Sequence, residues 1–393
     1  MWLQRLELLN FRSYAEQDIT FNEGVTLFIG PNGQGKTNLI EAICRVSTGS
    51  SHRNTSDQPL LRLNASPTLI RTHLRTHSGR ERQIDLQLGA PRPRMRLDGQ
   101  DQRRATDVIG VLRTVLFAPE DLAIVRGDPG ERRRFLDDIL SQRRSMYANA
   151  KADYDRVLRQ RNQLLKQFRT LPPSSHSQAR ETLDVYTEQL VTYATPIIAA
   201  RVAGLRVLFP NLHAGYHAIS GKNETVRVQY VPAVTSNDVI ADTRWHSDVR
   251  DEDVPTSQEI AEVLRLSLQQ VQRDEEQRGV TLVGPHRDDV EFMLGDFPAK
   301  GYASHGETWS LTLALKLATR EILTLDDDPP VVLLDDVFAE LDERRREHLA
   351  KACESFSQVI VSAAVGADVP LQGEMYSVVK REGVSTAQKV DDL

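Results

Sequence analysis

The stretch that decides the fold is Gly30-Pro31-Asn32-Gly33-Gln34-Gly35-Lys36-Thr37. It fits the pattern G-x-x-x-x-G-K-[ST], in which glycines let backbone N–H groups close around phosphate oxygens. In that pattern the lysine, here Lys36, reaches the β and γ phosphates, and the hydroxyl of Thr37 is a ligand for Mg²⁺. A β-type apolar run, Val25–Ile29, precedes the loop, and the helix formers Leu39–Ile43 follow it, so the phosphates would also meet a helix N-terminus. All eight residues are predicted to bind ATP; the alternative is a simple glycine-rich turn.

A second motif lies far along the chain. It reads Val331-Val332-Leu333-Leu334-Asp335-Asp336, and Thr37 and Asp335 are 298 residues apart. The apolar run predicts a buried parallel strand, whose C-terminal end is where α/β sheets bind ligands. Asp335 is expected to hold Mg²⁺ together with Thr37. Asp336 is expected to orient or deprotonate the attacking water, so Lys36, Asp335 and Asp336 are the candidate catalytic residues. The alternative is an aspartate that caps a helix after an ordinary core strand.

Two further segments narrow the class of ATPase. Glu340-Leu341-Asp342 follows the paired carboxylates as the D-loop of ABC-type ATPases does. The segment Ser304-His305-Gly306-Glu307 opens a helical run and resembles the ABC signature S-G-G-Q, with His for Gly and Glu for Gln. In that signature a serine and a helix N-terminus bind nucleotide held by another subunit. Ser304 and Gly306 are therefore candidate nucleotide-binding residues, and a plain helix cap is the alternative.

Composition excludes several classes of protein. The 393 residues are 40% hydrophobic and 26% charged, which is ordinary globular usage. Two cysteines, Cys44 and Cys353, cannot form a disulfide framework and are expected to be packed thiols in a reducing compartment. The segment Met1–Arg12 carries charges where a signal peptide needs an apolar stretch. The purest apolar run, Val331–Leu334, is far shorter than the ~20 residues that span a bilayer, so we predict a cytoplasmic protein without a membrane partner.

Charge is distributed unevenly along the chain. The overall net charge is −6, yet residues 51–170 hold 24 Lys and Arg against 14 Asp and Glu, and 22 of those cations are arginine. The planar fork of arginine matches phosphate oxygens, so this block is a candidate surface for a nucleic-acid backbone. A solvated arginine-rich surface is the alternative. Arg132, Arg133 and Arg134 cannot all face one way on a helix, so one or two are expected to reach phosphate while the others pair internally.

The order of patterns predicts an α/β domain interrupted by an inserted helical lobe. Residues 1–122 are expected to form the N-terminal half of an ATPase domain, with antiparallel strands where short alternating stretches meet turn dipeptides in 52–117. Residues 123–279 are expected to form the lobe. Residues 280–393 are expected to complete the ATPase domain with the signature, the paired carboxylates and the D-loop.

Helix start and stop signals divide the lobe further. Asp128–Glu131 predicts a capping box with proline at the first helical position. Apolar stripes on either side of a break at residues 171–178 predict a helical hairpin. Residues 235–255 predict a loop, and Thr256–Glu259 predicts the start of a helix that runs to about Gly279. Strands are expected near residues 280–283, 331–334 and 358–362.

Several blocks, in this order and spacing along nearly the whole chain, resemble the RecF family of bacterial DNA replication and repair proteins. Besides the phosphate loop they are Asn10–Tyr14, Thr48–Arg53, Phe117–Leu122, Arg132–Asp137, Gly284–Asp289 and Leu333–Asp342. The insertion agrees with this: a transporter ATPase subunit would carry a smaller insert, and an SMC-type head would enclose hundreds of residues of heptads. The resemblance implies an ABC-type, SMC-head-like P-loop ATPase.

The resemblance also implies a function. Members of the family bind ATP and Mg²⁺, hydrolyse ATP slowly and dimerise on nucleotide. They bind single- and double-stranded DNA at gaps or junctions, which would stimulate the weak ATPase. They assist recombinase loading and SOS induction, with the mediator proteins RecR and RecO as partners.

The chain departs from the SMC-type pattern at two places. The usual Gln ligand of Mg²⁺ is replaced by Pro119-Glu120-Asp121, where Glu120 or Asp121 either substitutes for it or caps a turn. The switch position after the last core strand is Ser362 in place of histidine, so γ-phosphate sensing should be weaker. No role for the block Gly284–Asp289 follows from the sequence; a turn rich in polar caps is one interpretation.

Two functions of other classes stay open. A transporter ATPase subunit would bind membrane partners and show no stimulation by DNA. A structural DNA-bridging protein would bind ATP, and hydrolysis would be incidental to its role.

Overall fold

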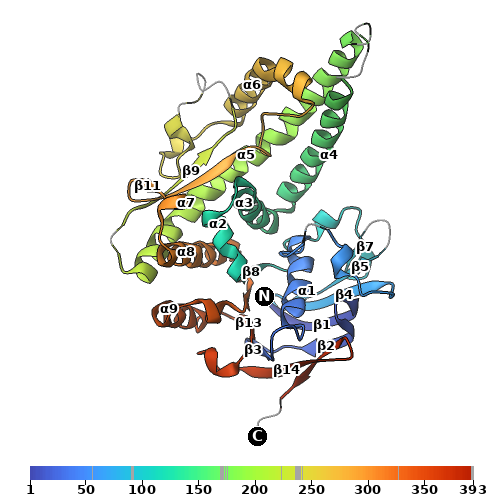
Figure 1. Cartoon of the computed structure of the whole chain (residues 1–393), viewed down its shortest axis with the longest axis vertical. Coiled ribbons are helices and arrows are strands. Elements are labelled where there is room, and N and C mark those ends of the chain that lie inside the picture. The colour runs from blue at the N-terminus through green and yellow to red at the C-terminus, as the bar shows by residue number, and fades with distance from the viewer. Residues whose placement is uncertain are drawn as a thin grey trace.

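The computed structural model describes the chain except residues 55, 90–92, 169–171, 173, 175, 223, 235–239, 241, 326 and 391–393. Parts of the predicted break at 171–178 and of the predicted loop at 235–255 lie outside the described residues. In Figure 1 the sheets labelled β1 to β5 and β14 lie toward the end that holds the C-terminus, and the helices α4, α5 and α6 extend toward the opposite end. Those three helices lie within residues 123–279, the segment predicted to form the lobe.

A six-stranded sheet in the order β15-β14-β3-β13-β12-β8 holds the nucleotide motifs. Its strands are β3 (Gly24–Ile29), β8 (Thr114–Phe117), β12 (Val331–Asp335), β13 (Gln358–Ala363), β14 (Glu374–Arg381) and β15 (Val384–Lys389). All neighbouring pairs are parallel except β14 with β15. Strand β12 is buried along its whole length, as expected for a central parallel strand. Only β13 separates β3 from β12, so their carboxyl ends meet at one edge, and the strands predicted near 331–334 and 358–362 are confirmed.

A second six-stranded sheet, antiparallel throughout, has the order β2-β1-β4-β5-β6-β7. Its strands are β1 (Trp2–Phe11), β2 (Tyr14–Thr20), β4 (Thr68–Arg75), β5 (Glu81–Leu88), β6 (Arg94–Leu97) and β7 (Gln100–Asp101). The antiparallel strands predicted within 52–117 are therefore confirmed. Helix α1 (Lys36–Thr48) shares one hydrophobic cluster with both sheets: Leu39 and Ile43 pack with Ile70 of β4 and Leu333 of β12.

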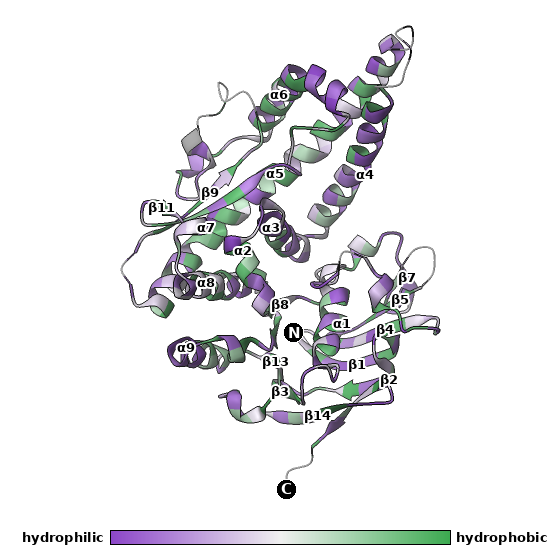
Figure 2. Ribbon diagram, viewed as in Figure 1, coloured by the Kyte–Doolittle hydropathy of each residue, from purple (hydrophilic) through white to green (hydrophobic). Residues whose placement is uncertain are grey.

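The remaining helices are α2 (Leu122–Arg126), α3 (Pro129–Arg143), α4 (Ser145–Phe168), α5 (His176–Ser220), α6 (Ser257–Arg278), α7 (Ala299–Tyr302), α8 (His305–Leu323) and α9 (Glu343–Cys353). Helices α4 and α5 pack against one another, which confirms the predicted hairpin. Among the described helices, α5 is long and apolar enough to cross a membrane by composition alone. Its apolar side chains instead pack against α4, α6 and α8, and Figure 2 shows hydrophobic residues along α5 beside a mostly hydrophilic α4.

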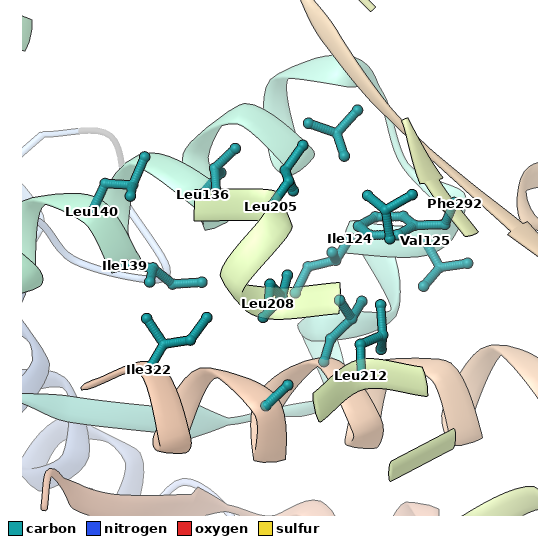
Figure 3. Packing of buried hydrophobic residues seen from close by; sticks show 14 of the residues in the cluster. Ile124, Val125, Leu136, Ile139, Leu140, Leu205, Leu208, Leu212, Phe292 and Ile322 are labelled. Atoms are coloured by element: carbon teal, nitrogen blue, oxygen red, sulfur yellow. The ribbon is translucent and has the colours of Figure 1, made fainter. Parts of the chain in front are cut away.

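The main hydrophobic core joins the lobe to the parallel sheet. In Figure 3, Leu136 and Leu140 of α3 lie near Leu205 and Leu208 of α5, with Ile322 of α8 below them. All five of these residues are at most 7% exposed. Burying each of these side chains stabilises the folded state by about 1.5–3 kcal/mol relative to leaving it exposed to water. The lobe is therefore fastened to the ATPase domain by continuous packing.

A third sheet crosses the predicted boundary at Gly279. Its order is β11-β10-β9, with β9 (Val226–Val231) from the lobe, β10 (Asp289–Leu294) and β11 (Phe297–Pro298). Strand β9 pairs antiparallel with β10 over its full length. Residues on both sides of Gly279 therefore share backbone hydrogen bonds.

Two local predictions were wrong. No strand forms at 280–283: the backbone N–H of Thr281 donates to the side chain of Asn162 at 2.7 Å, so it is not available to a sheet. The capping box at Asp128 is absent, although Asp128 is the N-cap and Pro129 the first residue of α3. The Asp128 carboxylate is 95% exposed and faces Lys300 at 3.9 Å. The capping box at Thr256 and the end of α6 at Gly279 are confirmed.

Candidate functional site

Two glycines of the phosphate loop are required by close contacts. A Cβ atom on Gly30 would lie 2.3 Å from the carbonyl oxygen of Val378. Gly35 has φ +112° and a Cβ there would lie 2.6 Å from the hydroxyl of Ser385. The same hydroxyl donates to the carbonyl oxygen of Gln34 at 2.6 Å. The loop between β3 and α1 is thus held by β14 and β15, strands that come from the end of the chain.

Lys36 points into this loop. Its ammonium donates to the carbonyl oxygens of Gly30 at 2.6 Å and Pro31 at 3.1 Å, and lies 3.4 Å from Oδ1 of Asn32. Burial lowers the pKa of Lys36, and the nearby carboxylates of Asp336 and Asp335 partly offset that effect. The positive charge is therefore placed where the loop's backbone N–H groups would meet an anion.

Thr37, Asp335 and Ser362 form a small hydroxyl and carboxylate cluster. The hydroxyls of Thr37 and Ser362 both donate to Oδ1 of Asp335, the first at 3.0 Å. Burial raises the pKa of Asp335, and the two hydrogen bonds act in the opposite direction. A hydroxyl and a carboxylate are oxygen donors of the kind that Mg²⁺ takes, so Thr37 and Asp335 fit the metal role predicted for them.

Asp336 lies at a sharp turn. Its φ is +54°, in the left-handed region, and its N–H donates to the carbonyl oxygen of Ser362 at 3.1 Å. Aspartate and asparagine adopt this conformation more readily than other side chains that have a Cβ. The Asp336 charge raises the pKa of Lys36, so the carboxylate acts on the same site.

The predicted signature residues lie elsewhere. Ser304 caps α8: its hydroxyl accepts from the N–H of Glu307 at 3.3 Å, and its own N–H donates to Glu307 at 2.8 Å. A Cβ on Gly306 would lie 2.7 Å from the guanidinium of Arg345. No hydrogen bond among the described residues joins Ser304 or Gly306 to the phosphate loop. Figure 1 shows α1 and α8 apart, on two sides of β8.

The structure separates the two acidic candidates that follow Pro119. Asp121 accepts from the N–H of Ala118 at 2.7 Å and pairs with Lys316 of α8 at 2.6 Å. Asp121 is therefore a turn cap within an ion pair. Glu120 and Asp121 both line a cavity of about 130 Å³, together with His52.

The block Gly284–Asp289 and the arginine triplet bind each other. Arg132 donates to both carboxylate oxygens of Asp289 at 2.7 and 2.8 Å, and Arg133 donates to the carbonyl oxygen of Asp288 at 2.6 Å. Arg134 donates to the carbonyl oxygen of Ser51. All three arginines therefore have protein partners, and Arg132 alone of the three is buried. The expectation that one or two of them reach phosphate stays a prediction. The block fastens α3 to β10.

Sequence reasoning gave no role to His52. Its side chain is 14% exposed, and Nε2 lies 3.9 Å from Oδ2 of Asp335. Both ring nitrogens are buried without a hydrogen-bond partner among the described residues. Burial lowers the pKa of His52 to about 4. Its membership of the block Thr48–Arg53, directly after α1, was the only signal in the sequence.

Comparison with known proteins places this geometry in a family. The family model for the RecF/RecN/SMC N terminal domain matches residues 2–386. The DNA replication and repair protein RecF of Kineococcus radiotolerans is 45% identical over 385 residues, 95% of this chain and 96% of that protein. The RecF of Streptomyces avermitilis is 42% identical over 382 residues, 96% of this chain and 98% of that protein. The chain belongs to the RecF family.

Solved structures agree. The recombination mediator protein RecF of the RecFOR pathway, in its ATP form, has a TM-score of 0.85 and 28% identity, covering 99% of this chain and 98% of that chain. An Smc head bound to the C-winged helix domain of ScpA has a TM-score of 0.56 at 17% identity, which shows the fold alone. The predicted fold, an ABC-type ATPase domain similar to SMC heads, is confirmed.

Proposed function

We propose that this chain is an ATP-dependent DNA-binding protein of recombinational DNA repair and replication. It binds single- and double-stranded DNA at gaps or junctions, dimerises on ATP, hydrolyses ATP slowly and assists recombinase loading and SOS induction. Support comes from relatives named DNA replication and repair protein RecF and from solved relatives described as recombination mediators with ATP.

The observation that carries the proposal is the convergence of Lys36, Thr37 and Asp335. Lys36 and the backbone N–H groups of Gly30–Thr37 would hold the phosphates. Thr37 and Asp335, whose oxygen atoms are 3.0 Å apart, would hold Mg²⁺. When bound, that ion would neutralise charge on the β and γ phosphates. Asp336 would take the proton of the attacking water.

The separation of Ser304 and Gly306 from the phosphate loop supports the proposed dimer. A twofold axis would let each copy present its α8 N-terminus to the nucleotide on the other copy. Because these contacts exist only in the dimer, ATP binding and association would be thermodynamically linked.

Partners and location complete the proposal. RecR and RecO are proposed partners because solved relatives belong to the RecFOR pathway. We place the protein in the cytoplasm without a membrane partner, because the apolar face of α5 packs against α4 and α8. The division into residues 1–122, 123–279 and 280–393 is part of the proposal, with β9 and β10 joining the last two segments.

The test is the ATPase rate with and without gapped duplex DNA, measured across protein concentrations. We expect a slow rate that rises with DNA and depends on protein concentration more steeply than linearly, because the active form is a dimer. A rate indifferent to DNA would favour a transporter subunit. Unchanged repair function in an Asp336→Asn variant that has lost turnover would favour a structural DNA bridge.

A further inference from the structure

His52 differs from His286, a second histidine whose pKa is lowered by burial. The ring of His286 is satisfied: Nδ1 lies 2.6 Å from the hydroxyl of Tyr154, and Nε2 lies 3.1 Å from the carbonyl oxygen of Thr281. Neither nitrogen of His52 has such a partner among the described residues. A buried polar atom left without a hydrogen bond costs about 1–3 kcal/mol, so it calls for an explanation.

The position of His52 beside Asp335 explains why its ring nitrogens have no protein partner. Nε2 lies 3.9 Å from Oδ2 of Asp335, whereas Thr37 contacts the other oxygen, Oδ1. This distance is too long for a hydrogen bond and falls in the range where one water contacts both groups. His52 also borders the cavity of about 130 Å³ that Glu120 and Ser50 line, which has room for water.

An unpartnered imidazole beside Asp335 could serve as a hydrogen-bond acceptor for water bound to Mg²⁺. Mg²⁺ dehydrates reluctantly and usually keeps several waters, which need acceptors around them. The segment Pro119–Asp121 replaces the usual Gln ligand, and Asp121 is already bound to Ala118 and Lys316. The imidazole of His52 has no hydrogen-bond partner among the described residues, and Glu120 is near enough for its charge to raise the pKa of Asp335.

We infer that His52 is a positioning residue that accepts a hydrogen bond from water bound to Mg²⁺ beside Asp335, in place of the missing glutamine. This inference rests on the proposed function and adds a residue to its magnesium site. Partners of this kind, which orient metal ligands without touching the metal, typically change metal affinity by about 10- to 100-fold when removed.

The experiment titrates a fluorescent ATP analogue into the full chain, first with EDTA and then at rising Mg²⁺ concentration. For His52→Leu we expect the half-saturating Mg²⁺ concentration to rise about tenfold or more, with metal-free binding unchanged. His52→Gln retains an acceptor of similar reach and should stay within about threefold of wild type. Cys44→Ala, which lines the same cavity, is the matched control and should behave as wild type.

Three results would overturn the inference. Unchanged Mg²⁺ dependence in a folded His52→Leu protein removes the role, and an equal loss of metal-free binding makes His52 structural. If the wild-type protein shows no Mg²⁺-dependent binding of the ATP analogue, the proposed function is contradicted, and the inference about His52 is contradicted with it. If His52→Leu does not fold, His52→Asn replaces it, because the shorter amide stays polar without reaching the site.

Discussion

The hydroxyl of Thr37 donates a 3.0 Å hydrogen bond to Asp335, 298 residues further along the chain. The whole lobe and strands β4 to β7 of the antiparallel sheet lie between them in sequence. Strands β3 and β12 bring the two residues together because both are parallel neighbours of β13. The candidate site is therefore assembled at the edge of the parallel sheet, and each part of it can be tested separately.

Lys36→Ala should weaken ATP binding about 10- to 100-fold, because a charge-assisted hydrogen bond contributes about 1.5–3 kcal/mol. Dimerisation and hydrolysis should be lost with it. Titration with a fluorescent ATP analogue measures the effect, and Lys351→Ala, which removes an exposed lysine of α9, is the control. If Lys36→Ala binds ATP as tightly as wild type, the proposal that the phosphate loop binds ATP is contradicted.

Asp336→Asn should reduce single-turnover hydrolysis about 100-fold or more while ATP binding stays intact, since the amide cannot take a proton. Asparagine tolerates the φ of +54°, so the protein should keep its stability. Asp336→Ala tests the backbone separately and should lower the free energy of unfolding by about 1 kcal/mol. Hydrolysis above a tenth of the wild-type rate in the Asn variant would exclude Asp336 as the base.

Ser304→Arg should leave ATP binding by the monomer nearly intact and abolish ATP-induced dimers, because the bulky cation blocks the contact with the partner's nucleotide. Sedimentation with a slowly hydrolysed ATP analogue measures this. Ser304→Ala is the control for the lost helix cap, which is worth about 1 kcal/mol. Mixing Ser304→Arg with Lys36→Ala protein should restore at most one working site per heterodimer. If Ser304→Arg dimerises with ATP as strongly as wild type, Ser304 acts only as a helix cap.

Asp138→Asn should stabilise the protein at pH 8 and change little at pH 5. Burial raises the pKa of Asp138 to about 7, and Arg134 offsets only part of that shift. The folded state thus binds this proton more tightly than the unfolded state, so Asp138 lowers stability as pH rises from about 4 to 7. We expect a gain of about 1–3 kcal/mol at pH 8, measured by chemical denaturation. A stability profile parallel to wild type across this range would contradict the expected burial.

Charge reversal of Arg94 and Arg103 should weaken DNA binding and flatten its salt dependence. Both side chains are exposed, whereas Arg132 is buried against Asp289. Each lost phosphate contact lowers the slope of log K against log salt by about 0.9, so the double variant should lose up to about 1.8. Exposed Arg273 and Lys351, outside the basic block, supply the control pair. An unchanged slope would show that the exposed arginines are only solvated.

The local signal at Thr256 gave the correct element, whereas the same kind of signal at Asp128 gave the helix start without a capping box. The capping box of α6 satisfies N–H groups within one turn, and it formed as predicted at Thr256. The strand predicted at residues 280–283 does not form, because the backbone N–H of Thr281 donates its hydrogen bond to the side chain of Asn162 on α4. A long-range hydrogen bond of this kind leaves no local pattern.

The sequence by itself determined the phosphate loop, the paired carboxylates and the family, because these depend on residue type at fixed short spacing. Only the tertiary structure showed that Asp121 caps the turn and pairs with Lys316, because these two paired residues are 195 positions apart. It also decided that Arg132 is buried against Asp289, and that His52 lies beside Asp335. Burial and partner choice depend on which distant surfaces meet, and the order of residues along the chain does not contain that information locally.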